Sequence, residues 1–295
     1  MVVAVGGTRL QRPVAPAAGY GQRVLPERVG TYAQGGEAVH LGNGYLRVDI
    51  VLSPDKIVLC PDLNAGCSLA DSCKAEDLKK YKEEHPGYQV VSYVNTTAAV
   101  KALTDCVVTS GNAKKVIDSF PQDAKIIFGP DYNLGNYINS VTGRNMLLWN
   151  GGCHVHEKFS VEAIIKLKQE HPEAVVMAHL ECKAPVLAVA DVKGSTATML
   201  HYAQEHPEIK EYIIATEAGI LHELERNCPN VIFYPVPPEV SEGGVGCSCN
   251  ECEYMKMNSL KKIYNSLKFG WPTVEVAPEI AKDAVKPIEK MLSLS

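Results

Sequence analysis

Residues 84–95 read EHPGYQVVSYVN, and residues 170–181, which lie 86 positions later, read EHPEAVVMAHLE. In both stretches a Glu-His-Pro turn precedes a short apolar run, and polar side chains follow that run. A proline marks the end of the preceding helix, and a short apolar run bounded by turn residues is typical of a strand buried on both faces. The stretch therefore predicts a helix, a turn and a buried strand, and the chain contains it twice.

The offset of 86 positions recurs outside these stretches. Cys67 follows a glycine, as does Cys153 at the equivalent position, and Ser110 falls within a residue of the counterpart of Ser195. Repeats of this kind set the architecture of a chain, and units in which strands alternate with helices predict parallel sheets covered on both faces. A third unit, residues 204–219, keeps the helix, proline and strand order but not the offset.

Composition narrows the class of protein. The chain has 295 residues, of which 46% are hydrophobic and 21% charged, with a formal net charge of -5. That balance excludes a disordered chain, and the acidic charge argues against a dedicated nucleic-acid binder. No apolar run approaches the roughly 20 residues that a membrane helix needs, and nothing reads as a cleavable secretory signal. We therefore expect a soluble, cytoplasmic protein without membrane or nucleic-acid partners.

The first fifty residues differ from the rest of the chain. They contain five of the seven arginines and nine of the 23 glycines, but no lysine and no cysteine. They show neither the period of a strand nor that of a helix. We expect residues 1–51 to form an atypical, weakly ordered segment.

Polar side chains stand at the carboxyl end of each predicted strand. Tyr93 and Asn95 occupy this place in the first repeat, and His179 and Glu181 are their equivalents in the second. Ligands of parallel α/β sheets bind outside the carboxyl ends of strands, so these four side chains are candidate site residues. A core histidine satisfied by the backbone is the alternative for His179.

A serine-containing turn follows each of these strands and predicts a helix start at Ser110 and at Ser195-Thr196. Free backbone N–H groups at such a start bind phosphate or carboxylate. For either residue taken alone, a plain N-cap without a ligand is the better explanation.

The chain has ten cysteines, which in a large chain without a secretory signal points to metal, cluster or redox chemistry. Cys67 and Cys153 follow glycines in equivalent loops, and Cys252 ends a Cys-Ser-Cys-Asn-Glu-Cys run. If each unit sends one loop to a common axis, three thiolates can bind an iron–sulfur cube and leave one iron open as a Lewis acid. The alternatives are a zinc site, for example Cys247, Cys249 and Cys252 with a histidine, and a redox role for the same run. Buried, inert thiols are the simplest interpretation of the cysteines in apolar runs, which are Cys60, Cys106, Cys182 and Cys228.

Five segments closely resemble the quinolinate synthase family, from about Leu52 to the C-terminus. They are PDLNAGCSLAD (61–71), YVNT (93–96), WNGGCHVH (149–156), HLEC (179–182) and CEYMKMN (252–258). The resemblance implies an α/β fold of three pseudo-threefold-related, three-layer α/β/α domains with parallel sheets, the first domain being incomplete in this chain. It also implies condensation of iminoaspartate with dihydroxyacetone phosphate to quinolinate in NAD biosynthesis, and functional coupling to an L-aspartate oxidase or dehydrogenase.

By position, the resemblance makes Cys67, Cys153 and Cys252 the ligands of a 4Fe-4S cluster. Glu181, His179 and Tyr93 resemble the catalytic residues, and the substrate-contacting set adds Asn95, Ser110, Ser195 and Thr196. The implied domains are residues 52–73 with 247–295 for the rest of the first domain, 74–153 for the second and 154–246 for the third.

This chain departs from the family pattern at its start. A His-Asn-Tyr-Gln stretch, which belongs to the first copy of the repeat in the family, has no counterpart in residues 1–50. The alternative function is therefore a catalytically impaired iron–sulfur or zinc-binding protein that lacks the first-repeat substrate motif.

Overall fold

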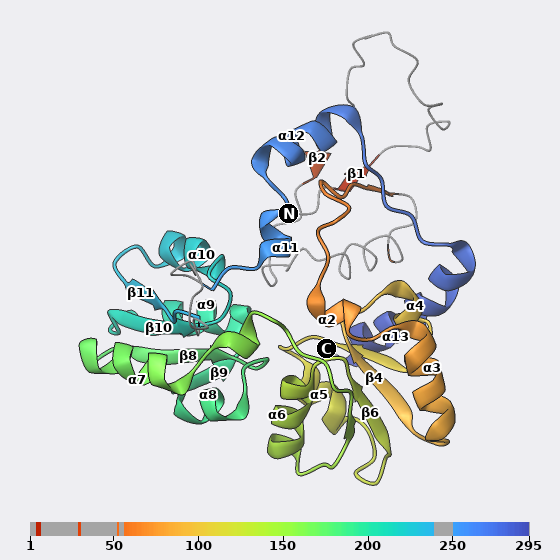
Figure 1. Ribbon diagram of the computed structural model, residues 1–295, viewed down its shortest axis with the longest axis horizontal. Helices are drawn as coiled ribbons and strands as arrows, with labels where there is room; N and C mark the ends of the chain where they lie inside the picture. Colours follow the sequence, from red (N-terminus) through yellow and green to blue (C-terminus); the bar gives the residue numbers. More distant parts are fainter. Residues whose placement is uncertain (1–3, 7–28, 31–51, 53–55, 239–249, 295) are drawn as a thin grey trace, which may run out of the picture.

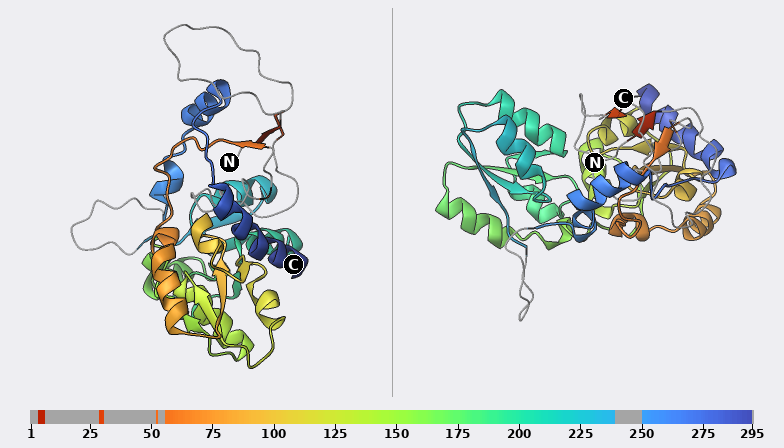
Figure 2. Two further views of the ribbon diagram at one scale, coloured as in Figure 1. Left: turned by 90° about the vertical axis from the view of Figure 1, so that its right-hand side faces the viewer. Right: turned by 90° about the horizontal axis from the view of Figure 1, so that it is seen from above.

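The structure is a computed structural model, which describes residues 4–6, 29–30, 52, 56–238 and 250–294. Two α/β lobes lie side by side, and a smaller part lies above the junction between them (Figures 1 and 2). We name the lobes the β4 lobe and the β8 lobe after their first strands. Among the described helices none is long and apolar enough to cross a membrane.

The β4 lobe contains a four-stranded sheet in the order β5-β4-β6-β7, and every pair of neighbours is parallel. The predicted buried strand is β4, which is first in chain order and second in the order across the sheet. The elements are α3 (Ala75–Glu84), β4 (Gln89–Tyr93), α4 (Ala98–Lys101), β5 (Cys106–Val108), α5 (Ala113–Asp118), β6 (Ile126–Gly129), α6 (Tyr132–Thr142) and β7 (Leu147–Leu148).

The β8 lobe repeats this sheet in the order β11-β10-β8-β9, again with parallel neighbours only. Its elements are η1 (His156–Lys158), α7 (Val161–Glu170), β8 (Val175–His179), α8 (Ala184–Val189), β9 (Val192–Gly194), α9 (Thr196–Glu205), β10 (Glu211–Ala215), α10 (Ile220–Asn227) and β11 (Ile232–Pro235).

The offset of 86 positions holds for whole elements. Adding it to the bounds of α3, β4 and β5 gives the bounds of α7, β8 and β9. Even a side-chain contact repeats, because Asp105 accepts the backbone N–H of Val90 at 2.7 Å and Asp191 accepts that of Val176 at 2.8 Å. The expected third unit is different: residues 204–219 form no separate repeat, because β10 pairs with β8 inside the same sheet and corresponds to β6.

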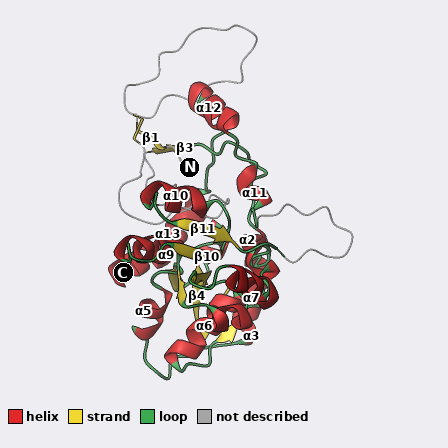
Figure 3. Ribbon diagram, turned by 90° about the vertical axis from the view of Figure 1, so that its left-hand side faces the viewer, coloured by secondary structure: helices red, strands yellow, loops and turns green. Residues whose placement is uncertain are grey.

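Each lobe has three layers, since helices cover both faces of its sheet (Figure 3). Along β8, Val176 and Ala178 pack against α7 and α8, whereas Met177 packs against α9 and α10. Successive residues of a strand point to opposite faces, so an unbroken apolar run is what a sheet covered on both faces requires. The predicted α/β class with parallel sheets is confirmed.

The smaller part differs from that expectation. Its sheet, in the order β2-β1-β3, joins β1 (Ala4–Gly6) to β2 (Val29–Gly30) and β3 (Lys56–Val58), and both pairings are antiparallel. The prediction of parallel sheets therefore does not extend to these strands, which lie outside the repeated units on which that prediction rests. The helices near this part are α2 (Ser68–Asp71), α11 (Glu253–Lys256) and α12 (Leu260–Phe269). The remaining residues of the segment 1–51 lie outside the described residues.

The last helix, α13 (Pro278–Leu294), belongs to the core of the β4 lobe. Its side chains Ala284, Ile288 and Met291 are buried in the same cluster as Val107 and Phe128 of that sheet. The sequence analysis assigned residues 247–295 to the first domain. The packing of α13 instead places this helix in the core of the β4 lobe. The other domain boundaries stay predictions.

Candidate functional site

The predicted site residues stand at the carboxyl ends of two equivalent strands. Tyr93 is the last residue of β4, and His179 is the last residue of β8. Asn95 and Glu181 follow two positions later, in the loops that leave these strands. All four side chains are buried.

Two carboxylates that the sequence analysis missed occupy the same position after the neighbouring strands. Asp131 lies two residues beyond β6, and Glu217 lies two residues beyond β10. They are 86 positions apart, so the repeat offset was the signal that could have identified them. Burial, followed by the nearby charge of Glu181, raises the pKa of Asp131 well above its ordinary value.

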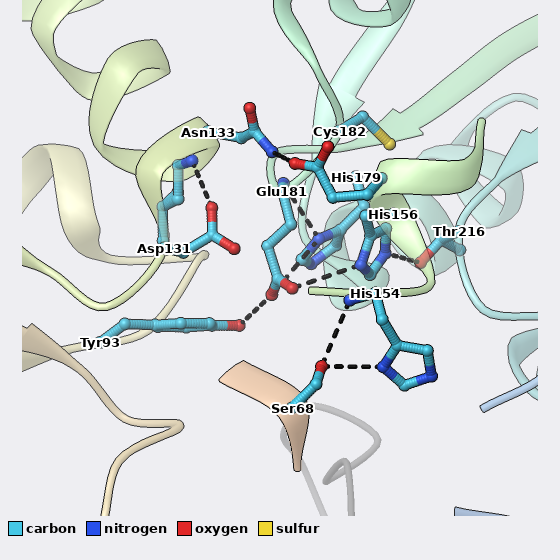
Figure 4. A network of polar contacts seen from close by, with 12 residues as sticks. Ser68, Tyr93, Asp131, Asn133, His154, His156, His179, Glu181, Cys182 and Thr216 are labelled. Carbon is cyan, nitrogen blue, oxygen red and sulfur yellow. Dashed lines mark hydrogen bonds and ion pairs between the residues drawn. The ribbon is translucent and has the colours of Figure 1, made fainter. Parts of the chain in front are cut away.

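Glu181 is the centre of a buried polar network that joins the two lobes (Figure 4). The hydroxyl of Tyr93, from the β4 lobe, donates to Glu181 Oε1 at 2.7 Å. On the other carboxylate oxygen, Nδ1 of His156 lies 3.3 Å from Oε2. The site is therefore assembled from both lobes, with the carboxylate of the β8 lobe between them.

Two histidines stack beside this carboxylate. The rings of His156 and His179 lie 4.8 Å apart between centroids, and Nε2 of His156 lies 3.0 Å from Oγ1 of Thr216. Burial disfavours the ionised form of Glu181, but the charges of His156 and His179 outweigh it, so the pKa of Glu181 is well below its ordinary value. The backbone N–H of Glu181 also lies 3.3 Å from Nδ1 of His179.

The three cysteines with predicted ligand roles share one local conformation. The carbonyls of Cys67, Cys153 and Cys252 each accept the backbone N–H four residues ahead, at 3.0, 3.0 and 3.1 Å. In each case the N–H groups two and three residues ahead interact with the sulfur and favour the thiolate. All three thiols are free and partly exposed. Hydrogen bonds from backbone N–H groups to sulfur are one of the means by which a protein adjusts an iron–sulfur cluster.

Neighbouring residues join the three cysteine loops to one another. Ser68, which follows Cys67, lies 2.8 Å through its hydroxyl from Nδ1 of His154, which follows Cys153. The ring of Tyr254, two residues after Cys252, packs edge-on against the His154 ring with centroids 5.6 Å apart. Loops that are distant in sequence therefore pack against one another beside their cysteines.

Electrostatic interactions link the thiols to one another and to Glu181. Burial raises the pKa of Cys67 to about 11, and the charges of Glu181 and Cys252 add to the rise. Burial also raises the pKa of Cys153, with further contributions from Glu181 and Cys67. Cys153 is closest to the polar network, because its sulfur and donor atoms of His156 and Glu181 lie within 4.8 Å of one another.

The residues predicted to hold phosphate or carboxylate have different surroundings. Ser195 is the N-cap of α9, and its hydroxyl accepts the N–H of Thr198 at 3.2 Å; Thr196 is the first residue of that helix and is buried. Asn95 is buried, and its Oδ1 has no hydrogen-bond partner among the described atoms. An unpaired buried oxygen of this kind is available to a ligand.

The expected helix start at Ser110 is wrong. The helix α5 begins at Ala113 with Asn112 as its N-cap residue, and Ser110 lies in the turn before it. Oδ1 of Asn112 accepts the N–H of Thr109 at 2.7 Å and closes the turn, which delays the helix. The substrate role of Ser110 stays a prediction.

The expectation of buried thiols is confirmed for Cys60, Cys106, Cys182 and Cys228, none of which forms a disulfide within the described residues. Burial raises the pKa of each of these thiols. Cys247 and Cys249, for which zinc and redox roles were alternatives, lie outside the described residues.

Comparison with known proteins identifies the family of this chain. Residues 48–293 match the family described as quinolinate synthetase A protein. The quinolinate synthase of Trichodesmium erythraeum is 47% identical over 245 residues, which are 83% of this chain and 74% of that protein. The quinolinate synthases of Microcystis aeruginosa and Nostoc punctiforme are 45% and 46% identical over 245 residues, covering 83% of this chain and 75% and 74% of those proteins. A match over this length and at this identity means that the chain belongs to the quinolinate synthetase A family of enzymes.

Proposed function

We propose that this enzyme condenses iminoaspartate with dihydroxyacetone phosphate to quinolinate in the cytoplasm, on the route to NAD. Atom balance for this reaction requires the release of one phosphate and two water molecules. The site must therefore hold carboxylates and a phosphate, move protons and assist the loss of oxygen. The observation that carries the proposal is the joining of three like cysteine loops next to the buried Glu181 network.

The donor set fits a 4Fe-4S cluster on Cys67, Cys153 and Cys252. The three thiols are free, lie near one another, and each interacts with backbone N–H groups that favour its thiolate. Three cysteines leave one iron of such a cluster without a protein ligand, and an open iron supplies Lewis-acid assistance to a departing hydroxyl or a bound carboxylate.

Proton transfer is the task of the groups around Glu181. The carboxylate is ionised, and it accepts the proton of the Tyr93 hydroxyl in a 2.7 Å hydrogen bond. Tyr93 can therefore relay protons: its hydroxyl takes a proton from a substrate carbon as its own proton passes to Glu181, and the reverse transfer delivers a proton to a leaving oxygen. His179 adds a ring nitrogen for a substrate oxygen, and Thr216 orients His156 against the carboxylate.

We assign substrate binding to the loops that leave the carboxyl ends of the strands and to the start of α9. We assign Asn95, Ser110, Ser195 and Thr196 to the carboxylate and phosphate groups. The unpaired Oδ1 of Asn95 and the backbone N–H groups at the start of α9 support this assignment. Because iminoaspartate must come from the oxidation of aspartate, we also propose functional coupling to an L-aspartate oxidase or dehydrogenase.

Anaerobic reconstitution with iron and sulfide tests the proposal. The wild-type chain should take up about four irons per chain and form quinolinate from the two substrates. Any one of the substitutions Cys67→Ser, Cys153→Ser and Cys252→Ser should abolish both cluster binding and activity. The control Cys228→Ala, at a buried thiol in the β8 lobe, should keep both. A reconstituted wild-type protein that holds the cluster but forms no quinolinate would instead support the impaired iron–sulfur protein.

A further inference from the structure

We propose that the cluster-free protein binds one zinc ion between Cys153, His156 and Glu181. The sulfur, a ring nitrogen and a carboxylate oxygen of these residues lie within 4.8 Å of one another, and no other such group is found in the described part of the chain. Cysteine, histidine and carboxylate are the ligands that zinc takes in proteins, and three of them leave the fourth tetrahedral position for water.

The position of the His156 ring indicates that these three donor atoms face a common point. Its Nδ1 has no hydrogen-bond partner among the described atoms, although it lies 3.3 Å from Oε2 of Glu181 and the side chain is only 3% exposed. The nitrogen therefore faces the carboxylate at ion-pair distance without a well-formed hydrogen bond. A cation placed between the two groups would use the lone pair of this nitrogen and the charge of the carboxylate together.

The partners that a metal site needs around its ligands are already in place. The other ring nitrogen of His156 lies 3.0 Å from the hydroxyl of Thr216, a contact that holds the ring while its Nδ1 faces Glu181. Oε1 of Glu181 accepts the hydroxyl of Tyr93 at 2.7 Å, so Oε2 is left for a metal. Outer contacts of this kind orient metal ligands and raise affinity for the ion.

Zinc at this position would exclude the proposed cluster, because both need Cys153. It would not need Cys67 or Cys252, whose sulfurs are not members of the zinc donor set. Zinc-loaded protein should therefore resist reconstitution with iron and sulfide until a chelator removes the ion. The zinc site is defined in the cluster-free protein, so its test does not depend on quinolinate formation.

Zinc competition against a chromophoric chelator, in reduced and metal-free full-length protein, tests the site. The Cys252→Ser chain is the reference, because it removes one of the three thiols of the competing Cys247–Cys252 run, and we expect it to bind one zinc per chain. Adding His156→Ala should weaken binding by more than about 100-fold, and adding Thr216→Val by about 10- to 100-fold. His154→Ala is the matched control, since His154 is two residues away and contacts Ser68 instead; it should leave affinity unchanged.

If the His156→Ala chain does not fold, a measurement on the wild-type chain still tests the proposal. One equivalent of zinc should slow alkylation of Cys153, read by mass spectrometry of its peptide, while Cys67 remains as reactive as in the metal-free protein. Equal protection of Cys67 and Cys153 would contradict the proposal, because it would place the ion among the three cysteines. Loss of zinc binding in Cys252→Ser, or full affinity in a folded His156→Ala chain, would also overturn it.

Discussion

Glu181 shows how single buried groups can prepare a site for proton transfer. A carboxylate with 2% exposure is expected to be neutral, because burial disfavours charge. Here the charges of two histidines and the hydroxyl of Tyr93 reverse that effect and keep the group ionised. An ionised carboxylate in a dry site makes a strong acceptor for the tyrosine proton, which is the property the proposed chemistry uses.

The Tyr93 hydroxyl can be removed without changing the shape of the core. Tyr93→Phe should lower the turnover number by about 10²- to 10⁴-fold, because the proton donor to substrate is lost while the ring still fills its place. Tyr212→Phe is the matched control: this tyrosine is equally buried, but its hydroxyl has no partner among the described atoms, so activity should be unchanged. Steady-state kinetics on the reconstituted variants measure both turnover numbers. A Tyr93→Phe enzyme as active as the Tyr212→Phe enzyme would show that the Tyr93 hydroxyl has no role in the chemistry.

Repetition explains which site residues could be predicted from the sequence. Tyr93, Asn95, His179 and Glu181 stand in two stretches that share an identical Glu-His-Pro turn, so their common place was visible. His156 was missed because the position 86 residues earlier holds an alanine, and a histidine without a counterpart gives no such signal.

Asp131 and Glu217 do share the offset, but the residues around them differ, so the offset marks them less clearly than the repeated Glu-His-Pro turn marks the other four residues.

The loops that hold the cysteines depend on close backbone packing. A Cβ atom at Gly151 would lie 2.2 Å from Oγ of Ser72 and 2.6 Å from the backbone oxygen of Pro130. At Gly66, which precedes Cys67, the nearest atoms to a Cβ would be the Tyr254 ring at 3.5 Å, an ordinary contact. Gly151 is therefore required for the approach of the Cys153 loop to the loop after Cys67, whereas Gly66 is not.

Alanine substitutions at these two glycines should separate their roles. Gly151→Ala should destabilise the protein by about 1–3 kcal/mol, because the backbone oxygen of Pro130 cannot move without displacing the loop, and iron uptake should fall with it. Gly66→Ala should change the free energy of unfolding by less than about 0.5 kcal/mol and keep full iron uptake. Urea denaturation with iron analysis measures both, and an equal loss in the two variants would contradict the packing argument.

Helix starts were the least predictable elements. Ser195 caps α9 as expected, but the equivalent turn in the β4 lobe has Gly111 and Asn112 after Ser110, and the asparagine closes the turn and becomes the N-cap residue. The competition between a serine and an asparagine for one turn is decided by backbone geometry that a single sequence does not reveal.

At the scale of the whole molecule, two equivalent α/β lobes bring their strand ends together at one site, and a smaller part lies above their junction. The sequence predicted the repeated unit and its parallel sheets, because the apolar runs and their offset are local features. It did not predict that α13 packs on the β4 lobe, since the apolar face of a helix does not say which sheet it covers. Pairing between distant segments, as in the antiparallel β1 and β3 strands, was likewise invisible.

The role of α13 in the core can be measured with two residues of the same helix. Ile288→Ala should cost about 2–5 kcal/mol, because the side chain is fully buried against the β4 sheet. Leu292→Ala, at a position with 55% exposure, should cost less than about 0.5 kcal/mol. Thermal and urea unfolding of the two variants provide the test, and a small effect at Ile288 would mean that α13 is not part of that core.

A crystal structure of the anaerobically reconstituted enzyme, with data collected at the iron absorption edge, would examine the proposed metal centre itself. We predict a single anomalous peak beside Glu181, bonded to the sulfurs of Cys67, Cys153 and Cys252. Iron bonded to a different set of cysteines, or iron bound without Cys67, would show that the three joined loops do not hold the cluster.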